Sequence, residues 1–166
     1  MSTTKSSPPP HGGLAADTRV LRQFRIVFNA VKSHFRQVEK AAGVAGAQLW
    51  ALSVIQSQAG LGVNDLARAM DVHQSTASNL VKALIQQQLV VAGKDGPDRR
   101  SVTLRLTDLG SSVLDKAPQP FAGVLPDALA SLDAATLARL EQDLAVLISA
   151  LNATDVHSAH TPLSDM

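Results

Sequence analysis

The sequence predicts a mainly α-helical fold that carries one small β-hairpin. Hydrophobic residues make up 45% of the chain but aromatic residues only 3%, and Ala and Leu dominate, which is typical of helical proteins. Apolar residues recur every three or four positions over several long stretches, as they do on the buried faces of helices. Between residues 89 and 106 this period gives way to two short β-type runs around a charged, turn-rich tip.

Composition narrows the class of protein. The 166 residues suffice for one well-buried domain together with an oligomerisation element. No apolar run approaches the roughly 18 residues of a membrane helix, and the N-terminus lacks the features of a secretory signal. The absence of Cys excludes disulfides, thiol catalysis and thiolate metal sites. We therefore expect a cytoplasmic protein without a cofactor.

The formal net charge of +1 conceals an asymmetry along the chain. Residues 1–45 carry a net charge of +5, residues 64–107 carry +2, and residues 108–166 carry −6. The basic and acidic parts could meet within a chain or across a dimer, or both could be solvated helix faces. The sequence leaves both interpretations open.

The N-terminal part predicts a tail followed by a long helix. Residues 1–16 are rich in Ser, Pro and Gly, so we expect disorder there. A helix should follow over 17–42, capped by Asp17 or Thr18 and ended by Gly43.

Three more helices are predicted before the hairpin, over about 45–58, 64–70 and 74–88. Residues 61–63 between the first two fit a very short strand that could pair with the hairpin. Asp71 lies at the tight turn between the second and the third helix, where a left-handed conformation is often needed and Asp tolerates it. Helix, tight turn, helix and hairpin in this order outline a winged helix-turn-helix with a two- to three-stranded wing.

The helix after the turn predicts two contrasting faces. Five apolar residues follow helical spacing and should point inward: Ala77, Leu80, Val81, Leu84 and Ile85. The outer face is polar and carries Lys82 as its charge. We expect Val72 to plug the turn, Asn64 to cap the preceding helix and His73 to cap this one.

Such an outer face suits base readout in a DNA major groove. Gln74 and Asn79 can each bond adenine in a bidentate manner, Ser75 and Ser78 can reach bases or phosphate, and Thr76 can contact a thymine methyl. Lys82 is placed for phosphate or guanine, and Asn64 and His73 lie near helix starts that favour phosphate. The alternative is that these side chains merely solvate a surface helix.

The hairpin predicts a second candidate DNA contact, separate from the one on the helix. Val102, Leu104 and Leu106 should alternate with Thr103 and Arg105 along its second strand. At its tip an Arg could enter a narrow minor groove, where the negative potential is concentrated. Asp98 and Arg100 are two residues apart and could pair across the tip. Arg99 could serve instead of Arg100, and an ordinary turn with surface charges is the alternative.

The C-terminal part predicts a broken helix and a leucine seam. Thr107 should cap a helix that prolines interrupt near 117–126, and Asp133 should cap the last one. Residues 153–166 are expected to form a loose tail. Leucines repeat in a three-four pattern that fits a partner helix: Leu137, Leu140, Leu144, Leu147 and Leu151.

An enzyme has little support in the sequence. There is no Gly-rich phosphate loop, no HExxH motif, and no set of nucleophile, base and orienting residue. His157 and His160 alone cannot hold a metal ion.

The stretches DLARAMDVHQSTASNLVKAL, QQLVV and DRRSVTLRLTDLG resemble the MarR (multiple antibiotic resistance regulator) family of bacterial transcription regulators. The resemblance covers about residues 18–152 and is strongest from Val63 to Gly110. It implies homodimers that bind a pseudo-palindromic operator and often repress transcription. It also implies dimerisation helices at 17–42 and 108–152, including Val20 and Phe24, and a DNA-binding lobe at 45–107, within a domain of 17–152.

The resemblance further implies release of DNA by a small, often aromatic and acidic molecule bound between dimer region and lobe. Arg22, His34 and Trp50 are candidate lining residues, although a surface position for His34 and core packing for Trp50 are alternatives. Two departures from the family pattern are Asp71, where Gly is common, and His73, a weak cap. A winged-helix module that binds protein rather than DNA remains the alternative function.

Overall fold

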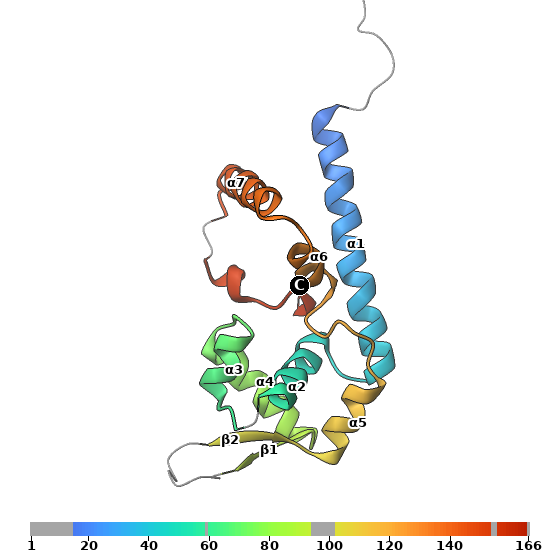
Figure 1. Cartoon of the computed structure of the whole chain (residues 1–166), viewed down its shortest axis with the longest axis vertical. Helices are drawn as coiled ribbons and strands as arrows, with labels where there is room; N and C mark the ends of the chain where they lie inside the picture. Colours follow the sequence, from blue (N-terminus) through green and yellow to red (C-terminus); the bar gives the residue numbers. More distant parts are fainter. Residues whose placement is uncertain (1–14, 59, 94–101, 154–155, 166) are drawn as a thin grey trace, which may run out of the picture.

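The computed structural model describes residues 15–58, 60–93, 102–153 and 156–165. It is mainly helical with one two-stranded antiparallel sheet, as the sequence predicts (Figure 1). Its elements are α1 Ala16–Ala42, α2 Gly46–Ser57, α3 Val63–Ala69, α4 Gln74–Gln86, β1 Val90–Gly93, β2 Thr103–Leu106, α5 Asp108–Lys116, α6 Val124–Ala130, α7 Ala134–Ala150, η1 Val156–His160 and η2 Leu163–Asp165.

The core lies in the lobe formed by α2, α3, α4 and the sheet, with one end of α1 and α5 against it (Figure 1). Leu49, Leu52, Leu66 and Leu84 are fully buried at its centre. α2 is apolar on nearly all sides, and it is surrounded by neighbouring elements. Such a helix must be buried, so it forms the centre around which the others are arranged.

The sheet pairs Val90 with Leu106 at one end and Gly93 with Thr103 at the other. The short strand predicted at 61–63 is not formed, but the Leu104 N–H donates to the Leu61 carbonyl at 2.9 Å, so this segment does lie beside the wing. The predicted alternation is wrong at its start: Val102 is 43% exposed, whereas Thr103 is buried.

Helix ends confirm several predicted caps and correct others. Gly43 ends α1 with a left-handed φ of 72°. The Thr107 hydroxyl accepts from the Gly110 N–H at 3.0 Å to start α5, and the Asp133 carboxylate accepts from the Thr136 N–H at 2.9 Å to start α7. The predicted cap of α1 is wrong, because Ala15 takes that position and no side chain caps it.

The start of α3 also differs from the prediction. Gly62 is the N-cap, and Asn64 lies exposed in the first turn. The Gly62 N–H donates to the Asp65 carboxylate at 3.0 Å. Asp65 therefore takes the role expected of Asn64, by reaching back from the third position of the helix.

The predicted break after the wing is confirmed. α5 ends at Lys116 and α6 begins at Val124, and none of the seven residues between them is helical. α6 packs on α1, and α7 stands apart from the lobe (Figure 1). The predicted loose tail beyond residue 153 contains two short 3-10 turns, and the second, η2, contacts both α1 and α2.

None of the described helices has the length and apolar character needed to cross a membrane.

Candidate DNA-binding surface

The turn between α3 and α4 fixes the position of α4. Asp71 adopts a φ of 51°, which confirms the predicted left-handed residue. The Val72 N–H donates to the Ala67 carbonyl at 3.0 Å, and the half-buried Val72 packs against the core as predicted. An L-residue at positive φ is strained, so these contacts are what hold the turn in place.

The two faces of α4 separate as predicted, with one exception. Ala77, Val81 and Leu84 are buried, and Leu80 is half-buried. Ile85 was expected inside but is 40% exposed. It lies one position past Leu84 on the helix, where the buried stripe has already turned away.

The outer face of α4 presents its polar side chains to solvent. Gln74, Ser75, Asn79 and Lys82 are exposed, and Thr76 and Ser78 are half-exposed. None of these side chains forms a hydrogen bond to another residue within the described part of the chain. Their donors and acceptors are therefore available to a partner, as readout of base edges requires.

His73 occupies the N-cap of α4 without a side-chain cap bond. Its ring instead packs edge-on against His160, with the ring centroids 4.9 Å apart. The first N–H groups of α4 therefore lack a capping side chain, and a helix end of this kind favours anionic groups.

Asp65 organises the start of α3 electrostatically. The Gly62 N–H and then the Arg68 guanidinium, which forms an ion pair with the carboxylate, hold the pKa of Asp65 below its ordinary value of 3.8. Asn64 lies beside this pair, and Asn64, Arg68, His73 and Gln74 line one shallow depression. The start of α3 and the start of α4 thus share one polar surface.

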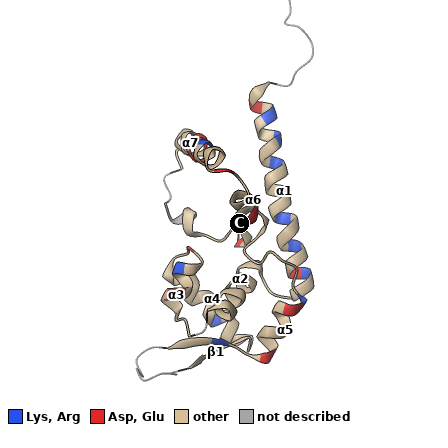
Figure 2. Ribbon diagram, viewed as in Figure 1, with Lys and Arg blue, Asp and Glu red and all other residues tan. Residues whose placement is uncertain are grey.

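The predicted wing residues Asp98, Arg99 and Arg100 lie outside the described residues. On the described part of the wing, Arg105 is exposed on β2. Lys and Arg residues also recur along α1, away from the wing (Figure 2).

The structure separates the three ligand candidates. Trp50 is half-buried and lines a cavity between α2, the turn before α4 and the segment after α5. Arg22 and His34 do not line it. Arg22 is exposed on α1, and the surface position considered for His34 is wrong, because its side chain is 7% exposed and its Nε2 lies 2.9 Å from the Pro120 carbonyl.

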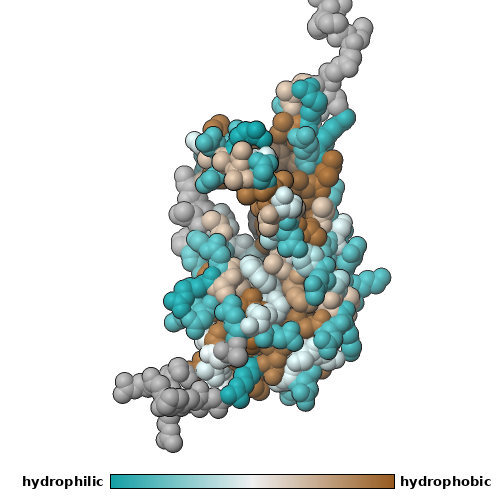
Figure 3. Space-filling view, viewed as in Figure 1, coloured by the Kyte–Doolittle hydropathy of each residue, from teal (hydrophilic) through white to brown (hydrophobic). Residues whose placement is uncertain are grey.

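The candidate dimerisation residues leave apolar surface uncovered in the single chain. Val20 is 49% exposed, Leu144 and Leu147 are each 37% exposed, and Leu151 is 67% exposed. Phe24, Leu137 and Leu140 are half-buried, and Phe24 stacks on Phe28 with ring centroids 6.2 Å apart. Apolar side chains gather along α1 on the face shown in Figure 3.

Sequence reasoning missed two sets of residues at this surface. His160 reaches the turn before α4, and the cavity beside Trp50 is partly lined by Phe121 and Pro162. The polar composition of the last residues concealed this role, because a segment without a helical or strand period gives no signal of where it packs. Among the described residues, no three His, Asp or Glu side chains lie close enough together to hold a metal ion.

The fold and the exposed face of α4 define a winged helix-turn-helix protein. The model of the MarR family matches residues 42–101, which span the helix-turn-helix and the first strand of the wing but end before β2. The predicted resemblance to this family is thereby confirmed.

Two curated regulators are similar in sequence. The transcriptional repressor MdtR of Bacillus subtilis (strain 168) is 29% identical over 84 residues, which are 51% of this chain and 54% of that protein. A transcriptional regulatory protein proposed for the hcr operon of Thauera aromatica is 31% identical over 110 residues, which are 66% of this chain and 65% of that protein. The chain thus spans between about half and two thirds of these relatives.

A solved structure supports the fold over a longer stretch. The crystal structure of the S. aureus MepR–DNA complex aligns with a TM-score of 0.56 at 21% identity, covering 82% of this chain and 99% of that one. The winged helix and the flanking helices therefore share one architecture with MepR.

Proposed function

We propose that this chain is a DNA-binding transcription regulator that acts in the cytoplasm as a homodimeric repressor and catalyses no reaction. The observation that carries the proposal is the outer face of α4, which follows the turn at Asp71. Its polar side chains are at least partly exposed and form no hydrogen bond to another described residue. The regulators similar in sequence support it, as does the MepR–DNA complex with the same fold.

We assign each part of the surface a role in DNA binding. Gln74, Ser75, Thr76, Ser78 and Asn79 read bases in the major groove, and Lys82 neutralises a phosphate. Asn64 and His73 contact the backbone at the helix starts. Arg100, directed by Asp98, enters the minor groove, with Arg99 as the alternative.

A dimer is part of the proposal because a single recognition helix reads too few bases. The exposed apolar faces of α1 and α7 pair with those of a second copy, so that two recognition helices reach major grooves about one DNA turn, or about 10 bp, apart. The operator should therefore be pseudo-palindromic. Pairing would also cover Val20, Leu147 and Leu151, which are exposed in the single chain.

Selection of bound DNA from a random pool tests the proposal directly. We expect one enriched motif with two inverted half-sites about 10 bp apart, centre to centre. A pool without any enriched motif would contradict sequence-specific binding and favour a winged-helix module that binds protein.

Two substitutions then test the proposed roles of Asn79 and Lys82 in binding to the selected DNA motif. Asn79→Ala should cost about 1–3 kcal/mol and relax the preference at one base pair of each half-site. Lys82→Ala should weaken binding to all sequences alike, and it should lower the salt dependence by about one unit for each phosphate that is no longer neutralised. Gln86→Ala, at the last residue of the same helix and about 10 Å along the axis from Asn79, is the matched control and should leave binding unchanged.

We further propose that a small aromatic molecule acts through the cavity beside Trp50. The cavity lies where the helices outside the lobe meet the turn that positions α4, so a molecule bound there contacts both. Thermal shift with a panel of aromatic acids, measured together with release of the selected DNA, tests this. If no compound stabilises the protein, a constitutive regulator is the better account.

A further inference from the structure

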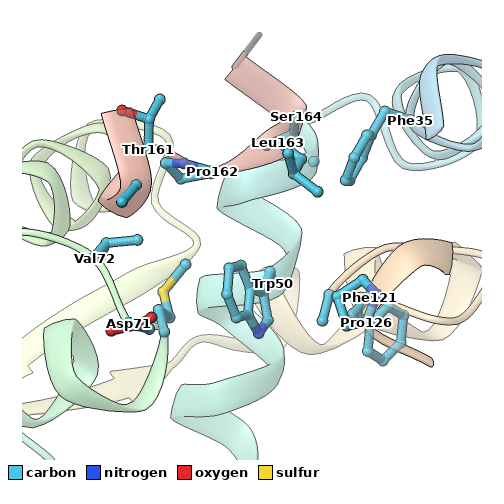
Figure 4. Close-up of a pocket in the computed structure, with 14 residues that line it drawn as sticks. Phe35, Trp50, Asp71, Val72, Phe121, Pro126, Thr161, Pro162, Leu163 and Ser164 are labelled. Carbon is cyan, nitrogen blue, oxygen red and sulfur yellow. The ribbon is translucent and has the colours of Figure 1, made fainter. Parts of the chain in front are cut away.

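The chain's own C-terminal segment lies across the cavity beside Trp50. Residues 160–164, here called the strap, run from the side of Val72 to the start of α2 (Figure 4). Pro162 is buried, and Thr161, Pro162, Leu163 and Ser164 all line the cavity. A Cβ atom added at Gly46 would fall 2.9 Å from the Ser164 Cβ, so the strap packs closely on the start of α2.

The strap also contacts the turn that positions α4. The His160 Nδ1 lies 3.2 Å from the Asp71 carbonyl oxygen and 3.5 Å from the Asp71 carboxylate. The same ring packs on His73, the N-cap of α4. One side chain of the strap thus contacts both the strained residue of the turn and the first residue of the recognition helix.

The space that remains beneath the strap is small. The cavity has a volume of about 170 Å³, whereas pockets that hold drug-sized ligands usually measure about 300–1,000 Å³. Its lining includes the apolar side chains of Phe35, Trp50, Val72 and Phe121. A larger aromatic molecule therefore fits only if the strap leaves.

The strap can leave as a unit. Two of its backbone hydrogen bonds are local: the Thr161 N–H donates to the Ser158 carbonyl at 3.3 Å, and the Asp165 N–H donates to the Pro162 carbonyl at 3.0 Å. Such local turns move with the segment and need not be broken when it departs. Departure breaks the interactions of His160 with the turn and the packing of Pro162 and Leu163 in the cavity.

We propose that the strap is a built-in occupant of the cavity, which excludes small molecules and holds the turn before α4 in place. Departure of the strap opens a larger aromatic-lined pocket and frees Asp71 and His73 at the same time. The covering of the cavity does not depend on DNA binding. Only the effect of strap departure on DNA affinity rests on the proposed function.

Trp50 makes the test direct because the chain has one Trp and no Tyr, so intrinsic fluorescence reports on this cavity alone. In the full chain, Pro162→Ser combined with Leu163→Ser should release the strap and raise acrylamide quenching of Trp50 by about twofold, because the shielding side chains are removed. Leu163→Ala should change quenching in the same direction by less. Asp165→Asn, an exposed change just after the strap that keeps an oxygen to accept from the Ser164 hydroxyl, is the control and should have no effect.

Hydrogen exchange tests the contact with the turn. His160→Ala should speed amide exchange at residues 71–73 about fivefold, the effect of losing about one hydrogen bond, and should leave exchange in the middle of α2 unchanged. Unchanged exchange at the turn would overturn the contact between strap and turn. Unchanged Trp50 quenching in the double variant and in Leu163→Ala would overturn the covering of the cavity.

A neutral aromatic probe, 1-naphthol, tests exclusion. Its affinity, followed by Trp50 fluorescence, should be about fivefold higher in the double variant than in the unmodified chain, since binding then requires no opening. Equal affinities would contradict exclusion by the strap. None of these measurements contains DNA, so their failure is distinguishable from failure of the proposed DNA binding.

Discussion

The helix-turn-helix lobe and the two outer helical arms bury their apolar residues very differently. In the lobe, Leu52, Leu66 and Leu84 have no exposed surface. In the arms, which are the N-terminal half of α1 and the whole of α7, Ile26 is 69% exposed and Val146 is 71% exposed. The core of the lobe is buried within one chain, whereas the arms present apolar surface that no described part of the chain covers.

This difference separates two kinds of stability. The lobe should be stabilised by contacts within one chain, so its unfolding should not depend on protein concentration. The arms should gain their stability from association, which does depend on concentration. Substitutions placed in the two regions can test whether the separation holds.

The largest effect is expected for a matched pair of Leu→Ala substitutions. Leu84→Ala in the lobe should lower the free energy of unfolding by about 2–5 kcal/mol, because it leaves a cavity in a fully packed core. Leu147→Ala in α7 should cost much less at low protein concentration, where its side chain is already partly in water. Urea titrations at two protein concentrations measure both. Equal losses for the two variants would contradict the comparison.

A second pair of substitutions tests the arms directly. Leu144→Glu combined with Leu147→Glu should raise the dissociation constant of the dimer more than about 100-fold, because unpaired charges would be buried at the interface. Gln142→Glu adds a charge on another face of the same helix and is the control. Sedimentation equilibrium distinguishes the outcomes, and a dimer that persists in the double variant would show that α7 does not form the interface.

The same contrast explains how far sequence reasoning succeeds. The spacing of apolar residues and the positions of turn-forming and capping residues predicted much of the lobe. They predicted the positive φ of Asp71, the cap at Thr107 and the buried stripe of α4 apart from Ile85. These features depend on residues close in sequence, so the conformational preferences and spacing of those residues suffice to predict them.

Contacts between distant segments were not predicted. His34 was considered a ligand-lining residue or, alternatively, a surface residue, yet its ring reaches Pro120, which is 86 residues away. The strap was interpreted as part of a loose tail because residues 153–166 are polar and contain a proline, although Pro162 is buried. At the start of α3, Gly62 and Asp65 replaced the predicted cap Asn64, since two residue types at nearby positions could satisfy the same N–H groups.

A smaller effect is expected at the boundary between wing and α5. The Thr107 hydroxyl accepts from the Gly110 N–H and donates to the Gln88 carbonyl at 2.7 Å, so it joins the end of the lobe to the next helix. Thr107→Ala should lower the free energy of unfolding by about 0.5–2 kcal/mol, and Thr107→Ser, which retains the hydroxyl, should restore most of it. Urea denaturation of both variants provides the measurement. A serine variant as unstable as the alanine variant would assign the loss to packing rather than to the cap.

The smallest expected effect is on the stability of the fold at low pH, and it again compares the lobe with an arm. The Gly62 N–H and the Arg68 guanidinium lower the pKa of Asp65 in the lobe, and hydrogen bonds from Thr136 lower the pKa of Asp133 at the start of α7. Because the folded-state pKa of each lies below its ordinary value of 3.8, the ionised form stabilises the fold at neutral pH. That contribution is lost as the pH falls below this value.

Asp65→Asn should therefore be less stable than the unmodified chain at pH 7, and the difference should shrink by about pH 3. Asp133→Asn should show the same trend in the helicity of α7 while leaving the unfolding of the lobe unchanged. Urea midpoints at both pH values, together with hydrogen exchange in α3 and α7, measure the two effects separately. A difference that stays constant or widens in acid would mean that Asp65 acts through its shape and not through its charge.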